Sequence, residues 1–276
     1  SATRQVDCIF PQALLIDSLH ELRGIIKLVG REIPQPTEVF YCLKDLSILH
    51  CPKFKYFLLL NSMHQRPVWF PKLERLTLDS CEELEDFTLV SIVEDSSPGE
   101  IGSVVVPNLR VLELLSLPTW GGTPCTGLLY TTLRQLTITG CREVRELFRF
   151  DPSQQHSQFR IPNLESVWVE CCENLEMIFS SSNSSCNLIL VFPKLKSLGL
   201  INLPKLWSIY RGVLLCSGIV EIIISWCPNY RRLEELSRPV ICDRSPSTLA
   251  CLPRYDANKD WWEPLRDFPE DMRCLS

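Results

Sequence analysis

The sequence lacks the usual signatures of an enzyme or a cofactor-binding chain. Its four histidines fall in separate segments, and none has a companion at metal-ligand spacing: His20, His50, His64 and His156. No Cys-x-x-Cys is present, which removes the common spelling of zinc and thioredoxin-like redox sites. No Gly-x-x-x-x-Gly-Lys is present either, so there is no loop of the type that holds phosphates. We therefore expect no catalytic, metal or cofactor site on this chain.

Long apolar runs and an excess of positive charge are also missing. No apolar run reaches the roughly 18 residues of a membrane helix, and no basic segment with an apolar stretch opens the chain as a secretory signal would. The 28 basic and 33 acidic residues are interspersed, and the net charge is −5, so we expect neither a membrane span nor a nucleic-acid surface. The chain begins with Ser1 rather than methionine, and we expect further sequence upstream.

What the sequence does contain is a repeat. In the stretch from Ile161 to Phe179 a proline is followed by Leu164, Val167 and Val169, and then by Cys172. The same spelling, Pro-x-Leu-x-x-Leu-x-Leu, recurs at 70–84, 106–120 and 192–206. Internal repeats with a short strand and a fixed leucine spacing are typical of leucine-rich repeats.

Each repeat predicts one short strand with its central apolar pair turned inward, because alternate residues of a strand face opposite sides. A single strand of this kind buries its apolar face only between neighbouring rungs. The predicted fold is therefore an α/β solenoid, a leucine-rich-repeat horseshoe. A parallel β-sheet lines its concave face, and irregular loops and short helices lie on its convex face. The successive rungs start 24 to 36 residues apart, which indicates insertions outside the strands.

The chain divides into three parts on this pattern. Residues 1–36 predict a degenerate or partial N-terminal repeat, because the apolar spacing there slips. Residues 37–236 predict about seven clear rungs, and residues 237–276 predict a capping segment. The pair Trp261-Trp262 in that last segment is expected to fold over the final rung and close the core.

Five of the 14 cysteines occupy the same position of their rungs, where the chain turns away from the strand: Cys51, Cys81, Cys141, Cys172 and Cys227. A small side chain with weak hydrogen-bonding capacity suits a turn in which it faces backbone. This placement explains the cysteines by packing rather than by reactivity. It requires free thiols, and we therefore expect an intracellular, reducing location such as the cytoplasm.

The residues between the inward positions predict an exposed, concave surface about 30 Å long at the usual strand spacing. On this surface Trp168 is the most distinctive residue, since a large aromatic side chain is a common anchor at protein interfaces. The alternative is that Trp168 only packs on neighbouring rungs. The candidate partner-binding residues on the concave face are Arg75, Asp79, Glu113, Thr137, Trp168, Glu170, Ile201 and Glu221.

The repeat spelling, together with Trp261-Trp262-Glu-Pro-Leu265 near the end, resembles the leucine-rich-repeat region of plant coiled-coil, nucleotide-binding disease-resistance proteins. The resemblance implies a module of an intracellular immune receptor that recognises a pathogen effector or a guarded host protein. It also implies an autoinhibitory contact with an upstream nucleotide-binding domain. ATP or ADP would bind only in that upstream domain, because this chain carries none of its motifs.

Other classes of repeat protein remain as alternatives. Substrate-binding repeats of F-box ubiquitin-ligase subunits also end in cysteine, but they are more even in length. Extracellular receptor ectodomains have uniform repeats of about 24 residues with Asn at the turn. An enzyme is the weakest alternative, because no site is apparent.

Overall fold

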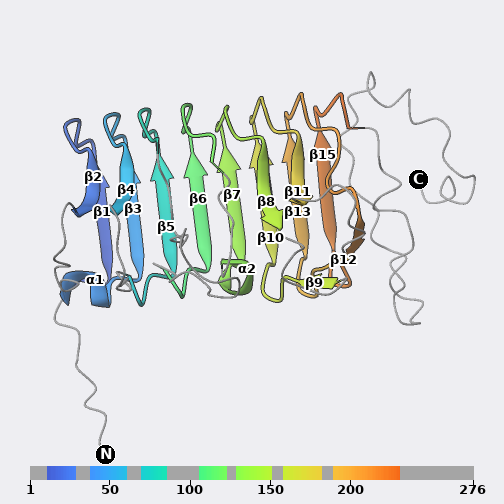
Figure 1. Cartoon of the computed structure of the whole chain (residues 1–276), viewed down its shortest axis with the longest axis horizontal. Helices are drawn as coiled ribbons and strands as arrows, with labels where there is room; N and C mark the ends of the chain where they lie inside the picture. The colour runs from blue at the N-terminus through green and yellow to red at the C-terminus, as the bar shows by residue number, and fades with distance from the viewer. Residues whose placement is uncertain are drawn as a thin grey trace, which may run out of the picture.

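The fold is organised by one long parallel sheet, which gathers a strand from every rung. The structure is a computed structural model, and it describes residues 11–28, 38–60, 70–85, 106–122, 129–150, 158–181 and 189–230. Figure 1 shows the strands side by side in chain order, from blue at the N-terminal end to orange at the C-terminal end. The eight strands are β1 (Ala13–Asp17), β3 (Asp45–Leu49), β5 (Arg75–Asp79), β6 (Val111–Leu115), β7 (Gln135–Thr139), β10 (Ser166–Glu170), β13 (Ser197–Ile201) and β15 (Glu221–Ser225).

Neighbouring strands pair without any offset, so that residues at the same position of each five-residue strand lie in one row. The second and fourth positions hold aliphatic residues, and Val167 and Val169 there are 0% exposed. The alternation of aliphatic and other residues predicts this burial, because successive strand residues face opposite sides. The predicted register and the leucine-rich-repeat fold are confirmed.

The first strand, β1, lies within the stretch whose apolar spacing slips. It pairs with β3 in full register, and Leu14 and Ile16 pack partly against the core. Within the described residues β1 has only one neighbour in the sheet, so its inward side chains are less covered than those of the inner strands. The predicted cap at residues 237–276 lies outside the described residues.

Short elements lie away from the long sheet in the connections between its strands. Within the described residues two of them are helices, and the others are strands in three small parallel sheets. The helices are α1 (Glu38–Cys42) and α2 (Leu129–Thr132), and the strands are β2 (Gly24–Leu28), β4 (Tyr56–Leu60), β8 (Glu146–Phe150), β9 (Gln158–Arg160), β11 (Met177–Ser181), β12 (Ile189–Val191) and β14 (Val213–Leu215). Sequence reasoning predicted the short helices but not the small sheets.

Phenylalanines fill the core between these elements in the C-terminal half. The ring centroids of Phe148 and Phe179 lie 4.9 Å apart, and those of Phe179 and Phe192 also lie 4.9 Å apart. Phe150 contacts Phe159 at 4.8 Å. Tilted ring pairs at such separations are favourable beyond their buried area, and here they connect β8, β9 and β11 across successive rungs.

Directly after each strand of the long sheet, one residue adopts a left-handed backbone conformation. These residues are Ser18, His50, Ser80, Ser116, Gly140, Cys171, Asn202 and Trp226, with φ between 50° and 69°. The amides of the first seven extend the ladder beyond the strands; the N–H of His50, for example, donates to the carbonyl of Asp79 at 2.9 Å. Only one of the eight is glycine, so the repeated hydrogen bonds stabilise a conformation that other residues adopt at a cost.

The turn cysteines lie just beyond this left-handed residue. Each thiol faces the carbonyl of the last strand residue, as Cys51 does with Leu49 at 3.2 Å and Cys172 with Glu170 at 3.4 Å. Burial raises the pKa of the Cys172 thiol to about 12. All five are free and buried, as their shared position predicts. Cys42, at the end of α1, is disulfide-bonded, so the pattern of free thiols does not extend to it.

In the described segments, no helix is long and apolar enough to cross a membrane.

Candidate functional site

The first, third and fifth residues of the eight strands form one exposed surface, which we call the sheet face. It corresponds to the concave surface predicted from the sequence. All eight predicted partner-binding residues lie on it: Arg75 and Asp79 on β5, Glu113 on β6, Thr137 on β7, Trp168 and Glu170 on β10, Ile201 on β13 and Glu221 on β15.

The structure brings some of these residues together and keeps others apart. Thr137 is the register partner of Trp168, and Glu170 is the register partner of Ile201. Two of the remaining residues are more isolated. The Asp79 carboxylate accepts a hydrogen bond from Ser80 at 2.9 Å, and Glu221 lies at the first position of the last strand.

Trp168 is half-buried because its indole ring lies across the neighbouring strand. Gly199 is its register partner on β13, and a Cβ atom built on Gly199 would meet the ring atom Cε3 at 2.4 Å. The ring nitrogen Nε1 donates to the Glu170 carboxylate at 3.4 Å. Both interpretations of Trp168 therefore apply: it packs on an adjacent rung, and it still presents part of its ring to the outside.

Two apolar side chains follow Trp168 toward the C-terminal end of the sheet face. Ile201 is the register partner of Glu170, and Ile223 is the register partner of Gly199; both are partly buried. We call Thr137, Trp168, Glu170, Ile201 and Ile223 the Trp168 patch. A half-exposed aromatic ring among aliphatic and acidic neighbours has the composition of an interface anchor.

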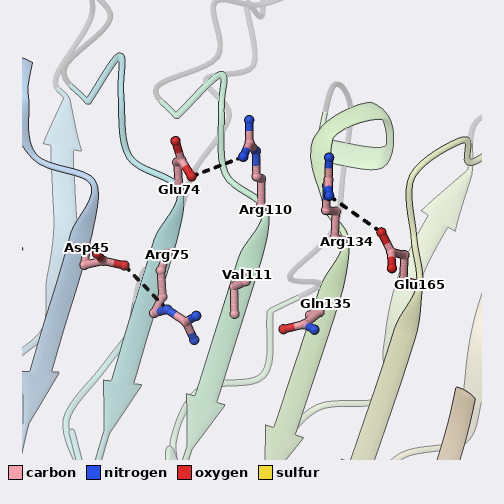
Figure 2. A pocket seen from close by; sticks show the side chains of 8 residues that line it. All are labelled: Asp45, Glu74, Arg75, Arg110, Val111, Arg134, Gln135 and Glu165. Carbon is pink, nitrogen blue, oxygen red and sulfur yellow. Dashed lines mark hydrogen bonds and ion pairs between the residues drawn. The ribbon is translucent and has the colours of Figure 1, made fainter.

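The other notable feature lies at the beginning of the strands, where charged residues surround a shallow hollow of about 230 Å³. Figure 2 shows its eight lining side chains: Asp45, Glu74, Arg75, Arg110, Val111, Arg134, Gln135 and Glu165. Only Arg75 among them is a predicted partner-binding residue, although Asp45, Val111 and Gln135 also lie between the inward positions of their rungs and so on the predicted concave face. The others that carry charge mostly lie one residue before a strand, outside the strict alternation from which the predicted face was drawn.

Ion pairs across neighbouring rungs hold the charged side chains of the hollow. Arg110 meets Glu74 at 3.2 Å, and Arg134 meets Glu165 at 3.7 Å. Arg75 lies 3.5 Å from Asp45 and 3.9 Å from Glu113. The last of these carboxylates also accepts a hydrogen bond from Thr77 at 2.8 Å, which connects the hollow to the middle row of the sheet face.

The described residues contain no cluster of histidine, cysteine, aspartate and glutamate suited to hold a metal ion. His50, one of the four histidines, lies 3.0 Å from Asp17 at the exposed end of the sheet. This hydrogen bond to His50 is the main reason why the pKa of Asp17 is lowered.

Comparisons with known proteins agree on one class of repeat. Residues 119–236 match a family model described as plant disease resistance protein RPS2-like, leucine-rich repeats. The chain is 24% identical over 217 residues, 78% of its length, to the probable disease resistance protein At4g27220 of Arabidopsis thaliana. It is 38% identical over 84 residues, 28% of its length, to the putative disease resistance protein At5g05400 of the same plant. It spans only 19% and 10% of the length of these relatives.

One solved structure with a similar arrangement is the leucine-rich repeat domain of the type III effector XopL. The TM-score is 0.46 at 18% identity, and the match covers 88% of this chain and 75% of that one.

Proposed function

We propose that the sheet face of this chain recognises a protein ligand during defence, a proposal supported by its similarity to the leucine-rich repeats of plant disease resistance proteins. The ligand would be a pathogen effector or a host protein that the receptor guards. The chain itself would act as a binding module, without chemistry of its own. Its sequence relatives are described as disease resistance proteins, which favours this function over substrate binding for an F-box ubiquitin ligase.

The observation that carries this proposal is the Trp168 patch on an uninterrupted sheet. Seven spacings of about 4.8 Å give the row of eight strands a length of about 34 Å. An ordinary protein interface occupies about 800 Å² on each partner, and a surface of this length accommodates one. Aromatic side chains near the centre of such a surface contribute a large share of the binding energy.

We further propose that the same repeats contact an upstream nucleotide-binding domain and hold it inactive. ATP or ADP would bind in that domain alone. A reducing, cytoplasmic location is part of this proposal, and the free, buried thiols at the turns support it, since such thiols persist where disulfides are rare. Cys42, which is disulfide-bonded, lies at the end of α1 and not at one of these turn positions.

The test uses the full-length receptor with Trp168→Ala, expressed in leaves and scored for cell death with and without a pathogen isolate that activates the wild-type protein. Loss of the response to the pathogen would support ligand recognition by the patch. Cell death without the pathogen would support a role in autoinhibition.

A matched control replaces a different exposed tryptophan. Trp226 is 59% exposed and follows the last strand, outside the sheet face, so Trp226→Ala should leave both readouts unchanged. If Trp168→Ala accumulates normally and behaves as the wild-type protein in both conditions, the Trp168 patch is not the recognition surface.

A further inference from the structure

The charges around the hollow follow an order that leaves its centre positive. Four charged residues each lie directly before the first residue of a strand: Glu74 before β5, Arg110 before β6, Arg134 before β7 and Glu165 before β10. The register aligns these strands without offset. Across the sheet the order is therefore negative, positive, positive, negative. Two guanidinium groups lie on adjacent strands, with a carboxylate on the outer side of each.

Each of these two arginines leans away from the other. Arg110 meets Glu74 through Nη1, and Arg134 meets Glu165 through Nη1, so each guanidinium uses one nitrogen on its outer neighbour. Figure 2 shows Val111 and Gln135 beside the gap between them. Arg110 and Arg134 remain 48% and 50% exposed. Glu165 also bonds Lys196 at 3.1 Å, so its charge is shared between two cations.

We infer that Arg110 and Arg134 form a seat for one carboxylate side chain of the protein ligand. A guanidinium carries five donors in a planar fork that matches a carboxylate. Each flanking ion pair is made through one guanidinium nitrogen, so both arginines keep further donors for a ligand. An anion between the two arginines also offsets their mutual repulsion. This inference rests on the proposed function, since it names the chemistry that the sheet face would recognise.

Size and charge both favour an acidic side chain over other anions. The hollow, about 230 Å³, is smaller than the roughly 300 Å³ at which small-molecule pockets begin. Its lining contains three arginines and three carboxylates. A phosphate dianion would face those flanking carboxylates with twice the charge of an aspartate or glutamate.

The distance between the seat and the Trp168 patch predicts how far apart the acidic residue and the apolar residue of the ligand lie in its sequence. Arg134 lies three residues before Thr137, which is the register partner of Trp168. Three residues of strand cover about 10 Å, and the step to the next strand adds about 4.8 Å at right angles. An extended ligand segment would therefore place its acidic residue about three or four residues from an aromatic or aliphatic one.

The experiment selects phage-displayed random 12-residue peptides on the complete 276-residue chain. The enriched peptides should carry aspartate or glutamate three or four residues from a large apolar residue. The strongest peptide should bind the Arg110→Gln/Arg134→Gln variant at least 10-fold more weakly. Both arginines are exposed, so the variant should melt as the wild type does. The control, Arg142→Gln/Lys205→Gln, removes the same charge from exposed sites outside the hollow and should bind as the wild type.

The other outcomes are distinguishable. Two results would overturn the seat and leave the proposed function in place. In the first, the enriched peptides need Trp168 for binding but carry no acidic residue. In the second, they carry an acidic residue but bind the Arg110→Gln/Arg134→Gln variant as tightly as the wild type. A peptide with phosphoserine at the acidic position that binds 10-fold more tightly would replace the carboxylate seat by a phosphate site. If no peptide is enriched on the folded chain, the proposed recognition surface fails, and the seat fails with it.

Discussion

Adding a single methyl group at Gly199 tests the packing of Trp168 directly. A Cβ atom at this position would lie 2.4, 2.7 and 2.9 Å from three atoms of the indole ring, whereas carbon atoms pack favourably at about 3.5–4.0 Å. The ring must therefore leave its place over β13 in the Gly199→Ala variant. Since the contact involves a side chain and not the backbone, the strand itself should remain intact.

The magnitude follows from the area that the ring would lose. A tryptophan buries about 200 Å² in a folded protein, and one ring face is about a third of this, or roughly 70 Å². At about 25 cal/mol per Å² the loss is near 1.7 kcal/mol. Alanine is favoured over glycine inside a strand by about 0.5–1 kcal/mol. Gly199→Ala should therefore destabilise the wild-type chain by about 1 kcal/mol.

In a Trp168→Ala background the ring is absent, and the same methyl group should stabilise by about 0.5–1 kcal/mol. Urea denaturation of the four proteins gives the coupling energy between the two positions, which we expect to be about 1.5–2 kcal/mol. Gly199→Ala should also shift tryptophan emission to longer wavelength as the Trp168 ring becomes solvated. An effect of Gly199→Ala that is equal in both backgrounds, to within about 0.3 kcal/mol, would refute the ring packing.

Three further predictions concern the core, the turns and the thiols. Val167→Asp places a charge where the side chain is 0% exposed and should lower the free energy of unfolding by at least about 3 kcal/mol. Ser166→Asp, on the sheet face, should lower it by less than about 0.5 kcal/mol. Similar circular dichroism melts for the two variants would show that the register is wrong. Gly140→Ala, at φ 69°, should cost about 1 kcal/mol in urea denaturation, and Gly140→Asn should cost less because Asn202 occupies this position two rungs later. The pKa of the Cys172 thiol is raised from 9.0 to about 12, so the folded chain holds this proton more tightly than the unfolded chain does. The stability that the buried, protonated thiol contributes is therefore intact below pH 9 and is lost as the pH rises toward 12. Iodoacetamide at pH 8 should label Cys172 only after denaturation, and rapid labelling of the native chain would contradict its burial.

The strand register could be predicted because burial imposes a fixed spacing on the sequence. Leu164, Val167 and Val169 repeat as aliphatic residues in rung after rung, and each is buried for the same physical reason. The turn cysteines were predictable in the same way, because Cys172 and its counterparts need both a small volume and a thiol that faces a carbonyl.

Features that depend on backbone geometry left little trace in the sequence. The left-handed residue after each strand of the long sheet is glycine once and serine, histidine, asparagine, cysteine or tryptophan in the other seven cases, since the hydrogen-bond ladder and not the side chain imposes the conformation. The packing of Trp168 on Gly199 had one available signal, the only glycine at the central position of a strand. Two of the three arginines of the hollow, Arg110 and Arg134, were missed because they precede their strands, where alternation makes no prediction.

Neighbouring strands pair without any register offset, whatever the length of the repeat that connects them. The length of a repeat therefore does not affect how its strand aligns with the next. Rungs that begin between 24 and 36 residues apart still align residue for residue. Unequal recombination that duplicates or removes one whole rung would therefore leave the pairing of the remaining strands unchanged. Each such event would insert or delete one column of side chains on the sheet face, and with it change the distance between the Arg110–Arg134 seat and the Trp168 patch in steps of one strand. A lineage of such genes can thus alter the surface that its sheet face presents by changing the number of rungs, without first having to repair its core.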